Sequence, residues 1–145
     1  MQALWLPAIQ SQLDLDRKNP TVALKALQVA SPLELGNIIF DSNTCLYHVY
    51  VRGQVYLAAG QGAAAEFQKI LDHSGLVVNC WTGALAHLGV ARANVLQART
   101  SQGVDGDGAR ARARAAYRDF LTLWKDADPD VPVLKQAKAE YAKLQ

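Results

Sequence analysis

Three segments of this chain repeat one spacing of apolar side chains, and this repeat constrains the fold more than any other feature. An alanine is followed by an apolar residue four positions later and another three positions after that. The repeat occurs at Ala23-Leu27-Ala30, Ala63-Phe67-Ile70 and Ala113-Tyr117-Phe120. Because such positions lie on one face of an α-helix, each set predicts the buried face of a helix.

A glycine lies at a matching position in the helical segment before two of these repeats. Gly53 follows Val49 by the same spacing as Gly89 follows Leu85. Glycine inside a helix costs about 1 kcal/mol relative to alanine. We therefore expect a neighbouring helix to approach closely at both glycines.

The Val49-Gly53-Tyr56 and Leu88-Gly89 sets, each followed by an alanine and an aromatic residue in the next helix, resemble the tetratricopeptide repeat family. The resemblance implies an all-α fold of about three stacked helical hairpins in a single domain over residues 1–145. It places the pairs at about residues 3–31, 46–72 and 81–126, with a capping helix at 131–144. The repeated alanines are 40 and then 50 residues apart, because of a link from Pro32 to Thr44 and an insertion from Gly103 to Gly108.

Longer stretches of the sequence narrow this resemblance. They are Tyr56–Gly60, Glu66–Leu71, Phe120–Pro129 and Leu134–Tyr141. They look like the carboxy-terminal tetratricopeptide region of acidobacterial serine/threonine kinases and winged-helix regulators. The resemblance implies a bacterial protein, and it suggests that this chain is the carboxy-terminal piece of a longer regulator.

Chain breakers and helix-forming composition set the expected helix boundaries. The expected helices are Leu4–Arg17, Pro20–Ala30, Leu46–Ala59, Ala63–Asp72, Trp81–Thr100, Gly108–Lys125 and Val131–Leu144. On the first of these, Leu6, Ile9, Leu13 and Asp16 form one stripe. We expect an extended link at Leu76–Asn79.

Acidic residues and one proline mark two of the expected helix starts. Asp105 or Asp107 is a candidate cap for the helix from Gly108, and Asp130 for the final helix. Pro132 would fall in the first turn of that final helix, where its missing N–H costs little. Leu134, Ala137, Tyr141 and Leu144 are expected to face inward.

Charge and hydropathy exclude several classes of partner. The formal net charge is +2, so bulk charge gives no argument for nucleic acid or an acidic membrane. Arg110, Arg114 and Arg118 form a helical stripe that we interpret as a solvated face. No run of about 18 apolar residues is present, so no membrane span is predicted.

The sequence shows no set of residues suited to catalysis or metal binding. Cys45 and Cys80 lack the second ligand pair of a zinc site, and we interpret them as two half-buried thiols, with a disulfide as the alternative. Asp105 and Asp107 lack the later glutamate of a calcium loop, and the glycines around them lack the lysine of a phosphate loop. We expect no enzyme activity, no cofactor and no metal.

The first helices of successive pairs would line a concave groove, which is the predicted binding surface. The predicted groove residues are Tyr47, Tyr50, Gln54, Leu57, Ala86, Val90 and Asn94. Tyrosines and amides suit an extended peptide or a helix. The alternative is that Tyr47 and Tyr50 only pack against other helices.

These features predict a non-catalytic scaffold that binds a protein or peptide partner. A regulatory or self-associating module of a longer kinase or transcription regulator, forming homo-oligomers, is the alternative. We expect a cytoplasmic location, or an extracytoplasmic one if the chain belongs to a membrane-anchored kinase.

Overall fold

The structure, a computed structural model, describes residues 2–30, 35 and 45–145, and its regular structure there is entirely helical. The described helices are α1 (Gln2–Asp16), α2 (Pro20–Leu27), α3 (Tyr47–Ala58), α4 (Ala64–Asp72), α5 (Ser74–Val77), α6 (Trp81–Thr100), α7 (Gly103–Leu123) and α8 (Pro132–Ala142). The all-α prediction is confirmed. Apart from Leu35, the expected link from Pro32 to Thr44 lies outside the described residues.

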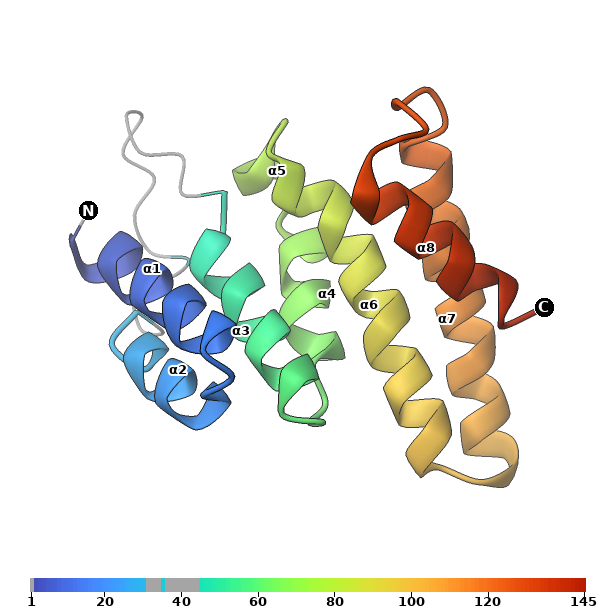
Figure 1. Cartoon of the computed structure of the whole chain (residues 1–145), viewed down its shortest axis with the longest axis horizontal. Helices are drawn as coiled ribbons and strands as arrows, with labels where there is room; N and C mark the ends of the chain where they lie inside the picture. The colour runs from blue at the N-terminus through green and yellow to red at the C-terminus, as the bar shows by residue number, and fades with distance from the viewer. Residues whose placement is uncertain (1, 31–34, 36–44) are drawn as a thin grey trace.

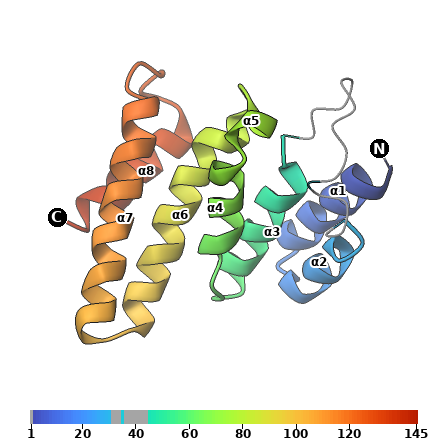
Figure 2. The same cartoon turned by 180° about the vertical axis from the view of Figure 1, so that it is seen from behind.

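The long helices follow one another as hairpins along the molecule. α1 packs against α2, α3 against α4 and α6 against α7, and each pair also contacts the next. α1, α3, α6 and α8 form one layer and α2, α4 and α7 the other, with the two chain ends at opposite ends of the molecule (Figures 1 and 2). The layer that holds α1, α3 and α6 is therefore built from the first helix of each pair.

The threefold sequence repeat marks the most deeply buried side chains of the stack. Eight of the nine repeat residues are fully buried, and Tyr117 is 2% exposed. Ala23 and Leu27 contribute to an apolar cluster of α1–α3, Ala63 and Phe67 to one of α3–α6, and Tyr117 to one of α6–α8. The buried face predicted for each second helix is confirmed.

Phe67 on α4 lies between the two mid-helix glycines. A Cβ added to Gly53 on α3 would lie 2.7 Å from Phe67 Cζ, and one added to Gly89 on α6 would lie 2.4 Å from Phe67 Cδ1. Real Cβ atoms do not approach an aromatic ring so closely. Both helices therefore need glycine to pack against Phe67, which explains the close approach expected from the sequence.

The glycine-rich run from Gly103 to Gly108 is helical, and the prediction that it forms a separate insertion is wrong. It forms the start of α7, preceded by Gln102 in an extended conformation, and no side chain caps the helix. A Cβ on Gly106 would lie 2.8 Å from the carbonyl oxygen of Ser101. Glycine is needed there because α7 begins directly against the turn that ends α6.

Two smaller sequence-based expectations are also wrong. The segment expected to be extended, Leu76–Asn79, overlaps the short helix α5, which ends at Val77 and buries that side chain in the core. Asp130 does not cap α8, because Val131 occupies the capping position; Asp130 pairs instead with Lys135 at 2.7 Å. Pro132 does begin α8, as predicted.

The stripe predicted on the first helix faces outward. Leu6, Ile9 and Leu13 are 59%, 48% and 45% exposed. The buried side chains on α1 include Ala8 and Ser11. These small residues let α2 and α3 pack close to α1, and close packing fixes the opposite side of the helix outward.

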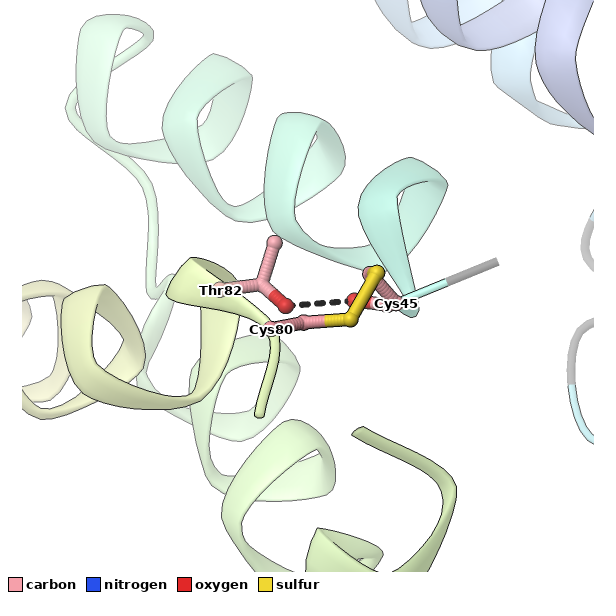
Figure 3. Close-up of a disulfide and its surroundings, with 3 residues drawn as sticks. All are labelled: Cys45, Cys80 and Thr82. Carbon is pink, nitrogen blue, oxygen red and sulfur yellow. Dashed lines mark hydrogen bonds between the residues drawn. A yellow bond between two sulfur atoms is a disulfide. The ribbon is translucent and has the colours of Figure 1, made fainter. Parts of the chain in front are cut away.

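Cys45 and Cys80 form a disulfide, so the prediction of two separate thiols is wrong. The bond joins the residues before α3 and α6, with a Cα–Cα distance of 5.6 Å (Figure 3). Beside it the Thr82 hydroxyl donates a 2.6 Å hydrogen bond to the Cys45 carbonyl oxygen. The disulfide and this hydrogen bond fix the start of α3 against the start of α6.

Candidate functional site

A cavity of about 850 Å³ opens on the layer that contains the first helices of the pairs. Its lining residues come from the end of α1, from α3, α6 and α7, and from α8 and the residues that follow it. They are Leu15, Gln54, Leu57, Ala58, Arg92, Val95, Leu96, Ala98, Arg99, Arg110, Tyr117, Glu140, Lys143 and Leu144. We call this cavity the groove.

Helix α6 lies between α3 on one side and α8 on the other (Figure 1). It provides the floor of the groove, with Val95 and Leu96 as its large apolar side chains. Leu57 on α3 and Leu144 after α8 add apolar surface on the two sides. All four side chains are partly exposed, so the groove offers apolar surface to another molecule.

A polar network joins three helices at the α8 side of the groove. Arg92 on α6 donates to both carboxylate oxygens of Glu140 on α8, at 2.9 and 3.1 Å. The Tyr117 hydroxyl on α7 donates to Glu140 at 2.9 Å. Burial and the bond to Glu140 raise the pKa of Tyr117, so this hydroxyl stays protonated as a donor. Because Glu140 accepts hydrogen bonds from both α6 and α7, these bonds hold the α8 wall against the two helices.

Two of the predicted groove residues line this cavity. Gln54 and Leu57 both lie on α3 and contribute to its wall. The Gln54 side-chain amide also donates to the Tyr50 hydroxyl at 3.0 Å, which fixes the orientation of Gln54. Of the four residues predicted on α3, the two in its C-terminal half therefore line the groove.

Tyr47 and Tyr50 lie in an aromatic cluster outside the groove. The ring centroid of Tyr47 is 5.9 Å from that of Trp5 and 5.6 Å from that of Trp81. The Tyr50 ring lies 5.2 Å from Trp81 and 5.8 Å from Phe67. Burial raises the pKa of both hydroxyls. This arrangement corresponds to the packing alternative considered from the sequence.

The three residues predicted on α6 lie within the helix stack. Ala86 is fully buried, and Val90 packs against the two apolar clusters on either side of α6. Asn94 is 4% exposed; its amide donates to the Val90 carbonyl oxygen and its side-chain oxygen accepts from Arg112. None of these three side chains lines the cavity: Ala86 and Asn94 are buried, and Val90 is only partly exposed.

Apart from the buried Ala98, the groove residues of α6 that were not predicted from the sequence are Arg92, Val95, Leu96 and Arg99. They have the i, i+3, i+4, i+7 spacing of one helix face. Two aliphatic residues flanked by two arginines at helical spacing could have indicated this face.

The described residues contain no group of three or more side chains suited to holding a metal ion. His87 lies 3.9 Å from Asp119, and burial lowers the pKa of its imidazole. Within the described part of the chain, every helix is too short or too polar to cross a bilayer.

No protein-family model matches the chain, and no curated protein or solved structure matches it.

Proposed function

We propose that this chain is a non-catalytic scaffold whose groove binds a segment of another protein, on a stack of tetratricopeptide-like hairpins. The groove carries this proposal, because it joins five helices and presents apolar side chains beside charged ones. Surfaces of this composition are typical of peptide and helix recognition.

The proposed tetratricopeptide-like architecture draws support from the centre of the molecule. Phe67 packs between two glycines, one from the preceding helix and one from the following pair. A close contact between one pair and the next is what a stacked repeat requires, since each pair buries its apolar face on its neighbour. α8 covers the last pair, as a capping helix would.

An affinity pull-down with matched variants tests the binding function. Leu57→Glu/Val95→Glu places two carboxylates on the apolar groove surface, and Val104→Glu places one at a residue that is 88% exposed and outside the groove. We expect the groove variant to lose the captured proteins and the Val104 variant to keep them. Equal recovery by all forms, with folding verified by circular dichroism, would reject the groove as the binding surface.

Self-association is a second candidate, supported by the exposed apolar stripe on α1. Leu6, Ile9 and Leu13 face away from α2 and α3 at the end of the stack. The ends of repeat stacks are usually covered by polar surface, so an apolar end favours a further contact. Light scattering on the wild type and on Leu6→Glu/Ile9→Glu tests this candidate, which predicts a dimer only for the wild type.

The disulfide bears on the location of the protein. Disulfides persist in oxidising compartments and are rare in the cytoplasm. The Cys45–Cys80 bond therefore favours the extracytoplasmic alternative over the cytoplasmic location expected from the sequence. Thiol labelling of the protein isolated from its native source, with and without prior reduction, tests this proposal.

A further inference from the structure

The charges of the groove are strongly one-sided although the chain as a whole is near neutral. Arg92, Arg99, Arg110 and Lys143 line it, and Glu140 is the single carboxylate among its described lining residues. The formal net charge of the whole sequence is +2. Positive charge is therefore concentrated at the groove.

The single carboxylate of the groove, Glu140, is already paired with Arg92. Arg92 and Tyr117 occupy its carboxylate oxygens, so Glu140 cannot balance the other three basic residues. Among the described residues, the side chains of Arg99 and Lys143 make no hydrogen bond or ion pair. Arg110 pairs with Asp107 at 3.4 Å, but both side chains are more than half exposed, so water screens this pair strongly.

The partner must also match the apolar floor. Val95, Leu96 and Leu57 line the same groove as the polar network and the basic side chains. A partner that places apolar side chains on this floor would bring its flanking groups near Arg99, Arg110 and Lys143. Carboxylates at those flanking positions would complement the charges.

The backbone of the groove walls favours a helical partner over an extended one. The walls are helices, whose backbone N–H and C=O groups are paired within each helix. An extended peptide would find few backbone partners there, whereas a helix satisfies its own backbone groups. A helix also presents apolar and acidic side chains on adjacent faces.

We propose that the groove receives an acidic amphipathic helix of a partner protein, with its apolar face on Leu57, Val95 and Leu96 and its carboxylates toward Arg99, Arg110 and Lys143. This inference rests on the proposed binding function and adds the chemical class of the partner. It explains why a nearly neutral chain concentrates its cations around one apolar surface.

A charge-swap experiment with synthetic peptides tests the inference. The probes are fluorescent peptides of about 15 residues, roughly four helical turns, with a leucine stripe flanked by glutamates or by lysines. The full chain is compared with Arg99→Glu/Arg110→Glu/Lys143→Glu and with Lys25→Glu/Arg118→Glu/Lys125→Glu. The second variant, which we call the outer-face variant, has the same change of charge at exposed residues outside the groove.

Fluorescence anisotropy should give opposite orders of affinity for the two variants. We expect the wild type and the outer-face variant to bind the glutamate peptide at least about tenfold more tightly than the lysine peptide. The groove variant should prefer the lysine peptide, which also demonstrates that it is folded. Equal affinities for both peptides, or a reversal by the outer-face variant, would overturn the inference.

Three further outcomes bear on the result. A glutamate peptide with its leucine stripe scrambled should bind weakly, and equal binding would overturn the amphipathic requirement. A single-stranded oligonucleotide of equal charge that displaces the glutamate peptide efficiently would overturn the inference in favour of nucleic acid. Loss of captured proteins in the Leu57→Glu/Val95→Glu pull-down without binding of any peptide would leave the groove function standing and overturn the acidic helix alone.

Discussion

Phe67 and Tyr117 occupy the same position of the repeated pattern but have different surroundings. The Phe67 ring is enclosed by two glycines and makes only apolar contacts of the α3–α6 cluster. The Tyr117 ring is buried in the α6–α8 cluster, but its hydroxyl reaches Glu140 at the edge of the groove. One repeat position therefore serves packing alone in one hairpin, whereas in the next it also lines the groove.

Removal of the Phe67 ring should have the largest effect on folding. Phe67→Ala leaves a cavity between Gly53 and Gly89, and truncation of a buried phenylalanine costs about 3–5 kcal/mol. Chemical denaturation followed by circular dichroism measures this loss of unfolding free energy. A loss below about 1 kcal/mol would mean that the neighbouring helices close the gap, contrary to a tightly fixed junction.

Exchange of the two aromatic residues sharpens the comparison directly, beginning with Phe67→Tyr. The added hydroxyl would extend from Cζ, the atom nearest to a Cβ built on Gly53, and would lie in an apolar cluster. Overpacking and an unpaired buried hydroxyl together should cost about 2–4 kcal/mol. A stability equal to wild type in thermal and chemical denaturation would show that the site has room and a polar partner.

Addition of a single methyl group at Gly89 should have a smaller effect. The Cβ of Gly89→Ala would lie 2.4 Å from Phe67, while alanine favours the helix, so we expect a net loss of about 1–2 kcal/mol. Gly75→Ala is the matched control, because no atom lies within 4 Å of a Cβ there. The control should be neutral or slightly stabilising, and an equal effect at both glycines would contradict the close contact.

The reverse exchange, Tyr117→Phe, should have the smallest effect on stability. It removes one hydrogen bond while Arg92 still pairs with Glu140, so the expected cost is about 1 kcal/mol. The informative measurement is binding, because the α8 wall loses the hydrogen bond between Tyr117 and Glu140. We expect Tyr117→Phe to weaken the capture of proteins in the pull-down at nearly unchanged stability. Phe67→Tyr should instead act mainly by lowering stability.

Local sequence patterns predicted much of the fold because they report burial along single helices. The bounds of α6 were predicted to the residue, and Gly53 and Gly89 indicated a close helix contact. The Gly103–Gly108 run was misinterpreted because glycine favours loops in isolation, and the turn against Ser101 that requires Gly106 is a tertiary feature.

The groove was harder to predict than the helices. Of the residues predicted for it, Gln54 and Leu57 line the cavity, whereas Ala86, Val90 and Asn94 do not. α6 packs against α4, α7 and α3, so apolar residues occur around most of its circumference. Hydropathy then cannot distinguish the side that faces solvent. The same limit applies to α1, whose exposed stripe is also apolar. Hydropathy likewise gives no information on the pairing of the two cysteines.

The Cys45–Cys80 bond has a topological consequence for the centre of the molecule. It closes the chain from residue 45 to residue 80 into a covalent ring that contains α3, α4 and α5. A single proteolytic cut in the turn between α3 and α4 would therefore leave the two fragments linked until a reductant is added. The aromatic and glycine contacts around Phe67 lie on both sides of that turn, so the nicked protein would keep its central junction in register.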